Sequence, residues 1–335
     1  MAIIAFGGMF QVNAGDAPEL TDEVVPGEVA VSDAEKLENL RRASHEILSI
    51  FETTAWHEAG HALVAMTDPA IQKTWPVFKV TIIPNISKGY GGFTQPNAQL
   101  ASEMMGEIFR DTVENLKQIN MRDWNDVSSI ARIRDVIVEN YLGTIRLFFG
   151  GKVGEQMLGK EKLQSQLPYY SEDIDRMEKH REIGISSDMM YAKLYARLVI
   201  LLNSLNDVDF KALFDLINSF GDSSNVDRTI QTLKSAGAIG SLFTIFQKIQ
   251  LMISDVKTFD SKHKDAMDTL LQEQENLTVR ILEENIDKLR ELSGALLKKN
   301  TLYEDQIYEA AGMTSNPYEE GLVSEGSSLL LRSRL

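Results

Sequence analysis

The chain has 335 residues and contains no cysteine. Disulfide bonds, thiolate metal sites and a cysteine nucleophile are therefore excluded, and any bound metal must be held by nitrogen and oxygen atoms. Histidine is scarce, with five residues in the whole chain. Two histidines at a spacing suited to metal binding would therefore stand out.

Positive charge is also in short supply, because the formal net charge is −15. Such a chain repels a phosphate backbone, and no basic stripe with interleaved aromatic residues is present, so we expect no nucleic-acid partner. A near match to a phosphate-binding loop occurs at residues 154–161. Its last position holds Glu161 where Ser or Thr would bind magnesium, and the segment is helical in pattern, so we expect no nucleotide partner.

Long apolar runs are missing as well. No uninterrupted apolar stretch reaches the 18 or more residues of a membrane-spanning helix. The N-terminal segment lacks the basic residues of an export signal, since no Lys or Arg precedes Lys36. We expect a cytoplasmic or membrane-adjacent domain without an export signal.

Composition divides the chain into three parts. Residues 1–32 form an acidic lead-in rich in Pro, Gly and Ala, residues 33–312 carry the periodic patterns of a folded domain, and residues 313–335 form a tail without periodicity. A capping box of Ser32 and Glu35 predicts a first helix that ends near residue 51.

A second helix is predicted directly afterwards, capped by Thr53 or Thr54. The convincing strand signals are "VFKVTIIP" and "GYGGFT", which suggest a small hairpin or sheet. The remaining pattern is helical, and Thr301 with Glu304 forms a capping box for the last helix. The further helices are expected near 100–118, 126–149, 187–204, 207–219, 227–255, 262–297 and 302–311. The predicted fold class is mainly α.

The stretch "TTAWHEAGHALVAM" at residues 53–66 carries the clearest chemistry. Residues four apart lie on one face of a helix, so His57 and His61 can direct both imidazoles at one zinc ion. Glu58 is turned to one side, where a carboxylate can act as general base without being a ligand. The alternative interpretation is a buried helix that happens to carry two histidines.

A catalytic zinc needs a third protein ligand. The extended metzincin pattern would require Gly and His where the chain has Val64 and Thr67, so that class is excluded. No glutamate occurs between His61 and Glu103. The third ligand must therefore come from a distant part of the sequence.

Five blocks occur in the order "TTAWHEAGHALVA", "FKVTIIP", "GYGGFT", "RLFFGGKVGEQMLGK" and "GISSDMMYAKLYARLVI", followed late in the chain by "ILEENIDKLRELSGALLKKNTLYEDQI". Over residues 50–310 this order resembles the peptidase domain of the FtsH family of ATP-dependent zinc metalloproteases, the M41 peptidases. The resemblance implies an M41-like zincin fold, a zinc cofactor and an endopeptidase activity on protein or peptide substrates.

The resemblance also implies roles for particular residues. Asp188 would be the third zinc ligand, although an acidic residue that opens a helix at this point is also an ordinary N-terminal stabiliser. Glu155 would have a structural role near the ligands. The residues that would form an edge strand for an extended substrate, rather than an ordinary hairpin turn, are Gly91, Gly92, Phe93 and Thr94.

The chain departs from that family in two respects. We expect neither a membrane anchor nor an ATPase module in it, and we expect insertions near 96–149, 152–183 and 200–257. We therefore expect cleavage of unfolded or flexible proteins without an ATPase of its own. A separate ATPase or adaptor and a homo-oligomer are the partners that the family suggests. The alternative is a non-catalytic binding or regulatory protein with a peptidase-like fold.

Overall fold

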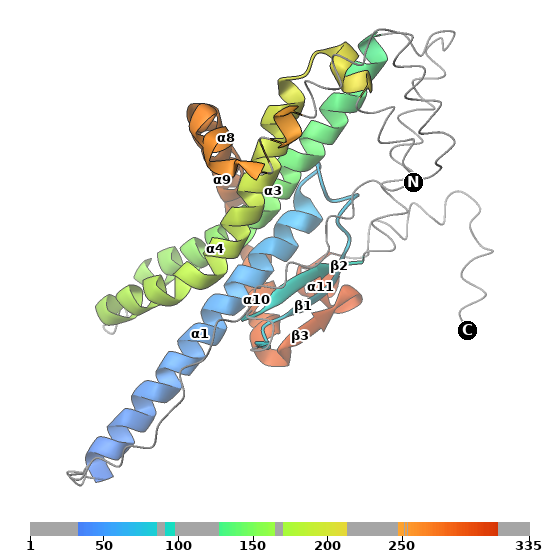
Figure 1. Cartoon of the computed structure of the whole chain (residues 1–335). Coiled ribbons are helices and arrows are strands. Elements are labelled where there is room, and N and C mark those ends of the chain that lie inside the picture. The colour runs from blue at the N-terminus through green and yellow to red at the C-terminus, as the bar shows by residue number, and fades with distance from the viewer. Residues whose placement is uncertain are drawn as a thin grey trace.

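The computed structural model describes residues 33–85, 91–97, 127–164, 170–212, 247–250, 252 and 254–313. These residues form a mainly helical structure with a three-stranded antiparallel sheet, as the sequence predicts (Figure 1). The three longest helices are α1 (Asp33–Thr67), α3 (Val127–Gln164) and α4 (Tyr170–Asn203). The shorter helices are α8 (Val256–Lys262), α9 (Lys264–Glu284), α10 (Ile286–Lys299) and α11 (Glu304–Ala310).

The sheet has the order β2-β1-β3 and lies beside α1 (Figure 1). Its strands are β1 (Val77–Thr81), β2 (Phe93–Pro96) and β3 (Thr301–Tyr303). The buried Val80 lies at the centre, opposite Thr94 on one side and Leu302 on the other. The first two strands fall within the predicted segments, whereas β3 is too short and too close to helices to have a sequence signal of its own.

The expected capping box at the last helix is wrong. Thr301 lies in β3, which the chain enters after Asn300 ends α10 in a left-handed conformation with φ of 61°. The helix is instead capped at Tyr303, whose backbone N–H donates to the side chain of Gln306 over 3.2 Å.

The predicted break between two N-terminal helices is absent, and α1 is continuous from residue 33 to residue 67. The two threonines that were expected to cap a new helix behave differently. Thr53 Oγ1 donates to the carbonyl of Ser49, and Thr54 Oγ1 donates to that of Ile50, each over 2.9 Å. These are bonds to the preceding turn of the same helix, which helical Ser and Thr side chains commonly make.

Two further helix boundaries differ from the prediction. α3 continues through Gly150 and Gly151 to residue 164, beyond the expected end near residue 149. α4 begins at Tyr170, so Asp188 lies in the middle of a helix and does not open one. Its expected role as an N-terminal helix stabiliser is therefore wrong, because the helix dipole acts only within the first turn. The segments of the expected insertions at 127–149, 152–164 and 170–183 are parts of α3 and α4.

The single helix expected over 262–297 is divided in three. His263 ends α8 and precedes α9, and Asn285 separates α9 from α10. Each separating residue has non-helical backbone angles, yet the apolar face continues across it, which explains why periodicity alone does not reveal the breaks. The helix expected near 100–118, residues 213–219 and residues 227–246 lie outside the described residues.

The helices α1 and α3 cross with their backbones in close contact. A Cβ atom on Gly60 would lie 2.1 Å from the carbonyl oxygen of Gly150, and one on Gly154 would lie 2.3 Å from that of Trp56. Only glycine fits at such separations, because no side chain can withdraw to relieve a contact between two backbones. Gly60 of α1 and the glycines of "GGKVGE" in α3 therefore determine how closely α3 approaches α1.

A buried ion pair connects the end of α1 to α3 and α9. The Arg146 guanidinium contacts both carboxylate oxygens of Asp68, and its Nη1 donates to Gln274 over 2.6 Å. Thr278 of α9 donates to the Arg146 carbonyl over 3.3 Å. Because both charges are paired and hydrogen-bonded, their burial is compatible with a stable fold. The network holds α3 against α9 and the end of α1. It does so at Arg146, the residue directly before Leu147.

We expect Gly60→Ala to destabilise the fold by about 1–3 kcal/mol or more, because the added methyl overlaps the backbone of α3. Chemical denaturation measures the change. Gly294→Ala in α10 is the matched control, since a Cβ there meets no atom within 4 Å, and it should stabilise the helix by roughly 0.5–1 kcal/mol. Equal stability of the two variants would contradict the proposed close packing.

Candidate metal and catalytic site

Residues from three helices converge at the crossing of α1 and α3. His57 and His61 extend from α1, Asp188 comes from α4, and Glu155 comes from α3. The Oδ2 atom of Asp188 lies 3.1 Å from His57 Nε2 and 3.2 Å from His61 Nε2, and the two Nε2 atoms are 3.0 Å apart. The structure thus brings together the three residues that were predicted as metal ligands.

The other ring nitrogen of each histidine is fixed by a partner on α3. His61 Nδ1 lies 2.7 Å from the carbonyl oxygen of Leu147, and His57 Nδ1 lies 2.6 Å from Glu155 Oε1. A carbonyl oxygen can only accept, so His61 must carry its proton on Nδ1. A carboxylate imposes the same arrangement on His57. In the neutral imidazoles both Nε2 atoms therefore present lone pairs to Asp188.

Three electron-pair donors that face one another repel unless a proton or a metal ion lies between them. Asp188 Oδ2 is a buried oxygen with no hydrogen-bond donor among the described residues. Ligand atoms of a tetrahedral zinc with bonds of about 2.0–2.2 Å lie roughly 3.3 Å from one another, close to the separations found here. The His57, His61 and Asp188 group can therefore bind a metal ion.

Gly151 provides the space beside these atoms. A Cβ on this residue would lie 2.5 Å from the Nε2 atoms of both His57 and His61. The rings cannot move away without losing their Nδ1 hydrogen bonds to Leu147 and Glu155. The position must therefore be glycine for lone pairs of both imidazoles to remain accessible.

Electrostatics show the same demand for positive charge. Burial lowers the pKa of His57, but its contacts with Asp188 and Glu155 and the nearby Glu58 outweigh burial and raise the pKa well above the usual value. Burial likewise lowers the pKa of His61. The negative charge and the close contact of Asp188 raise this pKa, and the net shift is upward. Burial raises the pKa of Asp188, yet the two histidines lower it overall. A proton or a metal ion can supply the positive charge.

Glu58 lies beside the metal-binding group but is not one of its members. Its pKa is raised by burial, against the opposing effect of His57 and His61. One carboxylate oxygen, Oε2, accepts a hydrogen bond of 2.8 Å from the Thr94 hydroxyl. A buried carboxylate with a raised pKa next to a candidate metal position is suited to taking up and releasing a proton.

The four residues predicted for substrate binding have different surroundings. Gly91 is exposed, and a Cβ there would meet one atom, Thr54 Oγ1 at 3.9 Å. Gly92 is tightly enclosed, since a Cβ would lie 2.7 Å from the Thr81 carbonyl oxygen and 2.9 Å from Glu58 Cγ. Phe93 is half-buried, and the Thr94 side chain is directed at Glu58. Two of the four thus pack against the candidate base.

Three features of the site were missed at the sequence level. The Leu147 carbonyl, the space provided by Gly151 and the Thr94 contact with Glu58 all depend on segments that only the fold brings together. The pair Gly150-Gly151 inside an otherwise helical segment was an available signal, because interior glycines in helices usually reflect close packing.

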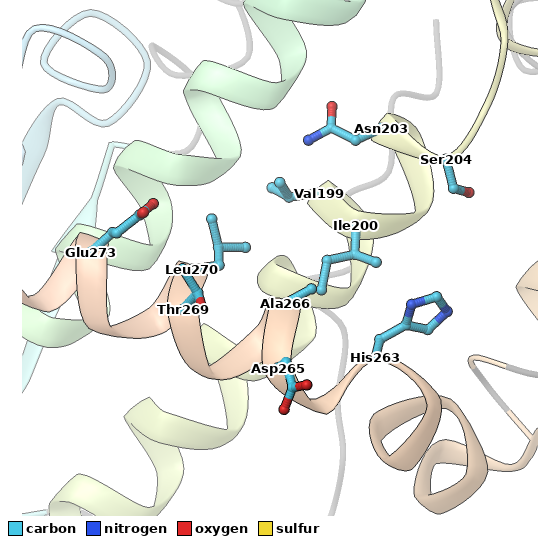
Figure 2. A pocket seen from close by; sticks show the side chains of 10 residues that line it. All are labelled: Val199, Ile200, Asn203, Ser204, His263, Asp265, Ala266, Thr269, Leu270 and Glu273. Carbon is cyan, nitrogen blue, oxygen red and sulfur yellow. The ribbon is translucent and has the colours of Figure 1, made fainter.

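A concave surface lies between α4 and α9 and is lined by none of these residues (Figure 2). It is a groove of about 610 Å³ with apolar side chains on facing helices, among them Val199, Ile200 and Leu270. His263, Asp265 and Glu273 also line it.

Within the described ranges, the His57, His61 and Asp188 group is the one cluster whose ligand atoms could hold a metal ion.

No known protein-family model matches the chain, and no curated protein matches it significantly. Among the described residues, no helix combines the length and the apolar character needed to cross a lipid bilayer. The fold and the site therefore define the protein's class: it is mainly helical, with a buried group of two histidines and one carboxylate that can bind a metal ion.

We expect Gly151→Ala to reduce metal affinity at least about tenfold, because the methyl takes the space in front of both Nε2 atoms. Elemental analysis and competition with a coloured chelator measure the change. Gly159→Ala on the same helix is the matched control, since a Cβ there meets no atom within 4 Å, and it should bind metal as the wild type does.

Metal affinity should also depend on pH. The raised pKa values of His57 and His61 mean that protons occupy the site more readily than in free imidazole. Below these pKa values, protons and metal compete, so affinity should fall by about tenfold per pH unit for each proton displaced. Chelator competition between pH 8 and pH 6 tests this expectation, and an affinity independent of pH would contradict it.

Proposed function

We propose that this chain is a zinc-dependent endopeptidase with a fold like that of the FtsH-family peptidase domain, which hydrolyses peptide bonds of unfolded or flexible proteins. The observation that supports it most strongly is the convergence of His57 Nε2, His61 Nε2 and Asp188 Oδ2 on one position. Glu58, the residue that a hydrolytic mechanism needs in addition, lies beside them with a raised pKa.

The donor set suits zinc. His57, His61 and Asp188 would hold the ion, with Glu155 and the Leu147 carbonyl fixing the imidazole tautomers. Sets of two histidines and one carboxylate also bind non-haem iron, but a buried carboxylate beside the ligands favours hydrolysis. When bound, zinc would polarise the scissile carbonyl and lower the pKa of a water molecule at the site.

Glu58 would act first as general base and then as general acid in this reaction. Its carboxylate accepts a proton from the attacking water as the new C–O bond forms. It then delivers that proton to the amide nitrogen as the C–N bond breaks, so that the amine leaves in neutral form. A pKa raised by burial serves both steps, because the group must gain and lose the proton at similar pH.

Strand β2 supports the choice of substrate. It is one edge strand of the sheet, and β3 is the other. The side of β2 that faces away from β1 has no partner strand among the described residues. An extended peptide can pair with such an edge through backbone hydrogen bonds. A segment must be extended to do so, which favours unfolded or flexible substrates; folded substrates would need a separate ATPase or adaptor.

The decisive variant is Glu58→Gln, which keeps the size of the side chain and removes the proton acceptor. We expect about one zinc per chain in both proteins, and a fall of about a hundredfold or more in cleavage of unfolded casein. Elemental analysis and a fluorescent casein assay measure the two quantities on the same preparations.

Glu38→Gln is the matched control, because Glu38 lies on the exposed half of α1 and pairs only with Arg42 among the contacts described. It should retain full activity. Zinc without wild-type turnover would favour the binding or regulatory protein instead, and turnover unaffected by Glu58→Gln would contradict the role of Glu58 as base. Iron in place of zinc in the purified protein would overturn the choice of metal.

A further inference from the structure

We propose that Thr94 is a positioning residue that holds Glu58 in place and connects it to the strand that receives the substrate. The inference rests on the proposed endopeptidase function. It assigns to Thr94 a role different from the direct substrate contact that the resemblance suggested.

The first argument is the hydrogen bond itself. Thr94 Oγ1 lies 2.8 Å from Glu58 Oε2 and 3.1 Å from the Glu58 backbone carbonyl. A hydroxyl has one proton to donate, and the shorter contact is to the carboxylate, where an ionised acceptor gives the stronger bond. Thr94 therefore stabilises one orientation of the Glu58 side chain.

The second argument is how the two carboxylate oxygens differ. Oε2 accepts from Thr94, whereas no hydrogen bond from the described residues is directed at Oε1. A flexible glutamate would interchange its two oxygens, but a fixed one always presents the same atom. Thr94 thereby leaves Oε1 as the oxygen that exchanges the proton.

Packing around the stem of Glu58 supports the same conclusion. A Cβ on Gly92 would lie 2.9 Å from Glu58 Cγ and 2.8 Å from Thr54 Cγ2, so the backbone directly before β2 closes over the Glu58 side chain. Gly92 lies one residue before β2, and both the Cβ position of Gly92 and the hydroxyl of Thr94 approach Glu58. The backbone at Gly92 and the hydroxyl of Thr94 thus fix Glu58 together.

The position of Thr94 connects substrate and base. The residue pairs with Val80 of β1, and the opposite edge of β2 is the edge proposed for the substrate. A peptide that pairs there would order the β2 backbone, and Thr94 would transmit that order to Glu58. The residue should therefore affect the rate of the chemical step and not the affinity for substrate.

The test compares Thr94→Val with Thr94→Ser. Valine keeps the shape and loses the hydroxyl, so kcat should fall roughly 10- to 100-fold, with KM within about twofold of the wild type and zinc content unchanged. Serine keeps the hydroxyl and should stay within about threefold of the wild type. An unchanged kcat in Thr94→Val, alongside active wild type, would overturn the inference while leaving the proposed function intact.

A double-mutant cycle provides a readout that does not depend on turnover. Unfolding of wild type, Thr94→Val, Glu58→Leu and the double variant is measured with urea, because leucine removes the acceptor that glutamine would keep. If the two side chains interact, the two single effects will not add in the double variant. Additive effects would overturn the inference, and an inactive wild type with a non-additive cycle would instead locate the failure in the proposed function.

Discussion

The contact between the backbones of α1 and α3 is the constraint on which the rest of the site depends. Gly60 of α1 and Gly150 and Gly154 of α3 let the two helices approach until their main chains touch. At that distance the Leu147 carbonyl and the Glu155 carboxylate reach the Nδ1 atoms of the two histidines. A wider crossing would leave both imidazoles free to rotate, and their Nε2 atoms would not be directed at Asp188.

The same contact explains why the site needs few additional supports. The ring orientations follow from α3, the third ligand follows from the packing of α4 on α3, and the carboxylate of Glu58 is covered by β2. The Arg146 and Asp68 ion pair secures α3 against the end of α1 next to these residues. Because each group is held by regular secondary structure, the geometry does not depend on the conformation of a loop.

The sequence predicted those features that depend on local periodicity. The spacing of His57 and His61 follows from the geometry of one helix, and β1 and β2 follow from β-branched and aromatic residues between turn signals. Asp188 could be named only through a resemblance of ordered sequence blocks. Its surroundings could not be predicted locally, because residues 187–204 have the pattern of a new helix although α4 begins at residue 170.

The remaining errors have a common physical origin. Thr53 and Thr54 have a side chain that can either cap a helix or bond to its preceding turn, and the packing of α1 decides between the two. Gly150 and Gly151 have low helix propensity, but contact with α1 overrides it. Asn285 interrupts a helix without interrupting its apolar face. None of these outcomes can be decided from local helix propensity alone.

The long sequence separation within the site has a consequence for how the chain folds. His57 and Glu155 are 98 positions apart, and His61 and Leu147 are 86 positions apart, so the imidazoles acquire their orientation only after a large part of the chain has become compact. Ligation of a metal ion by His57, His61 and Asp188 would act as a cross-link that closes a long loop, whose entropy is already lost in the native state. An ion bound there would therefore stabilise the whole helical core against unfolding and would not merely order one segment.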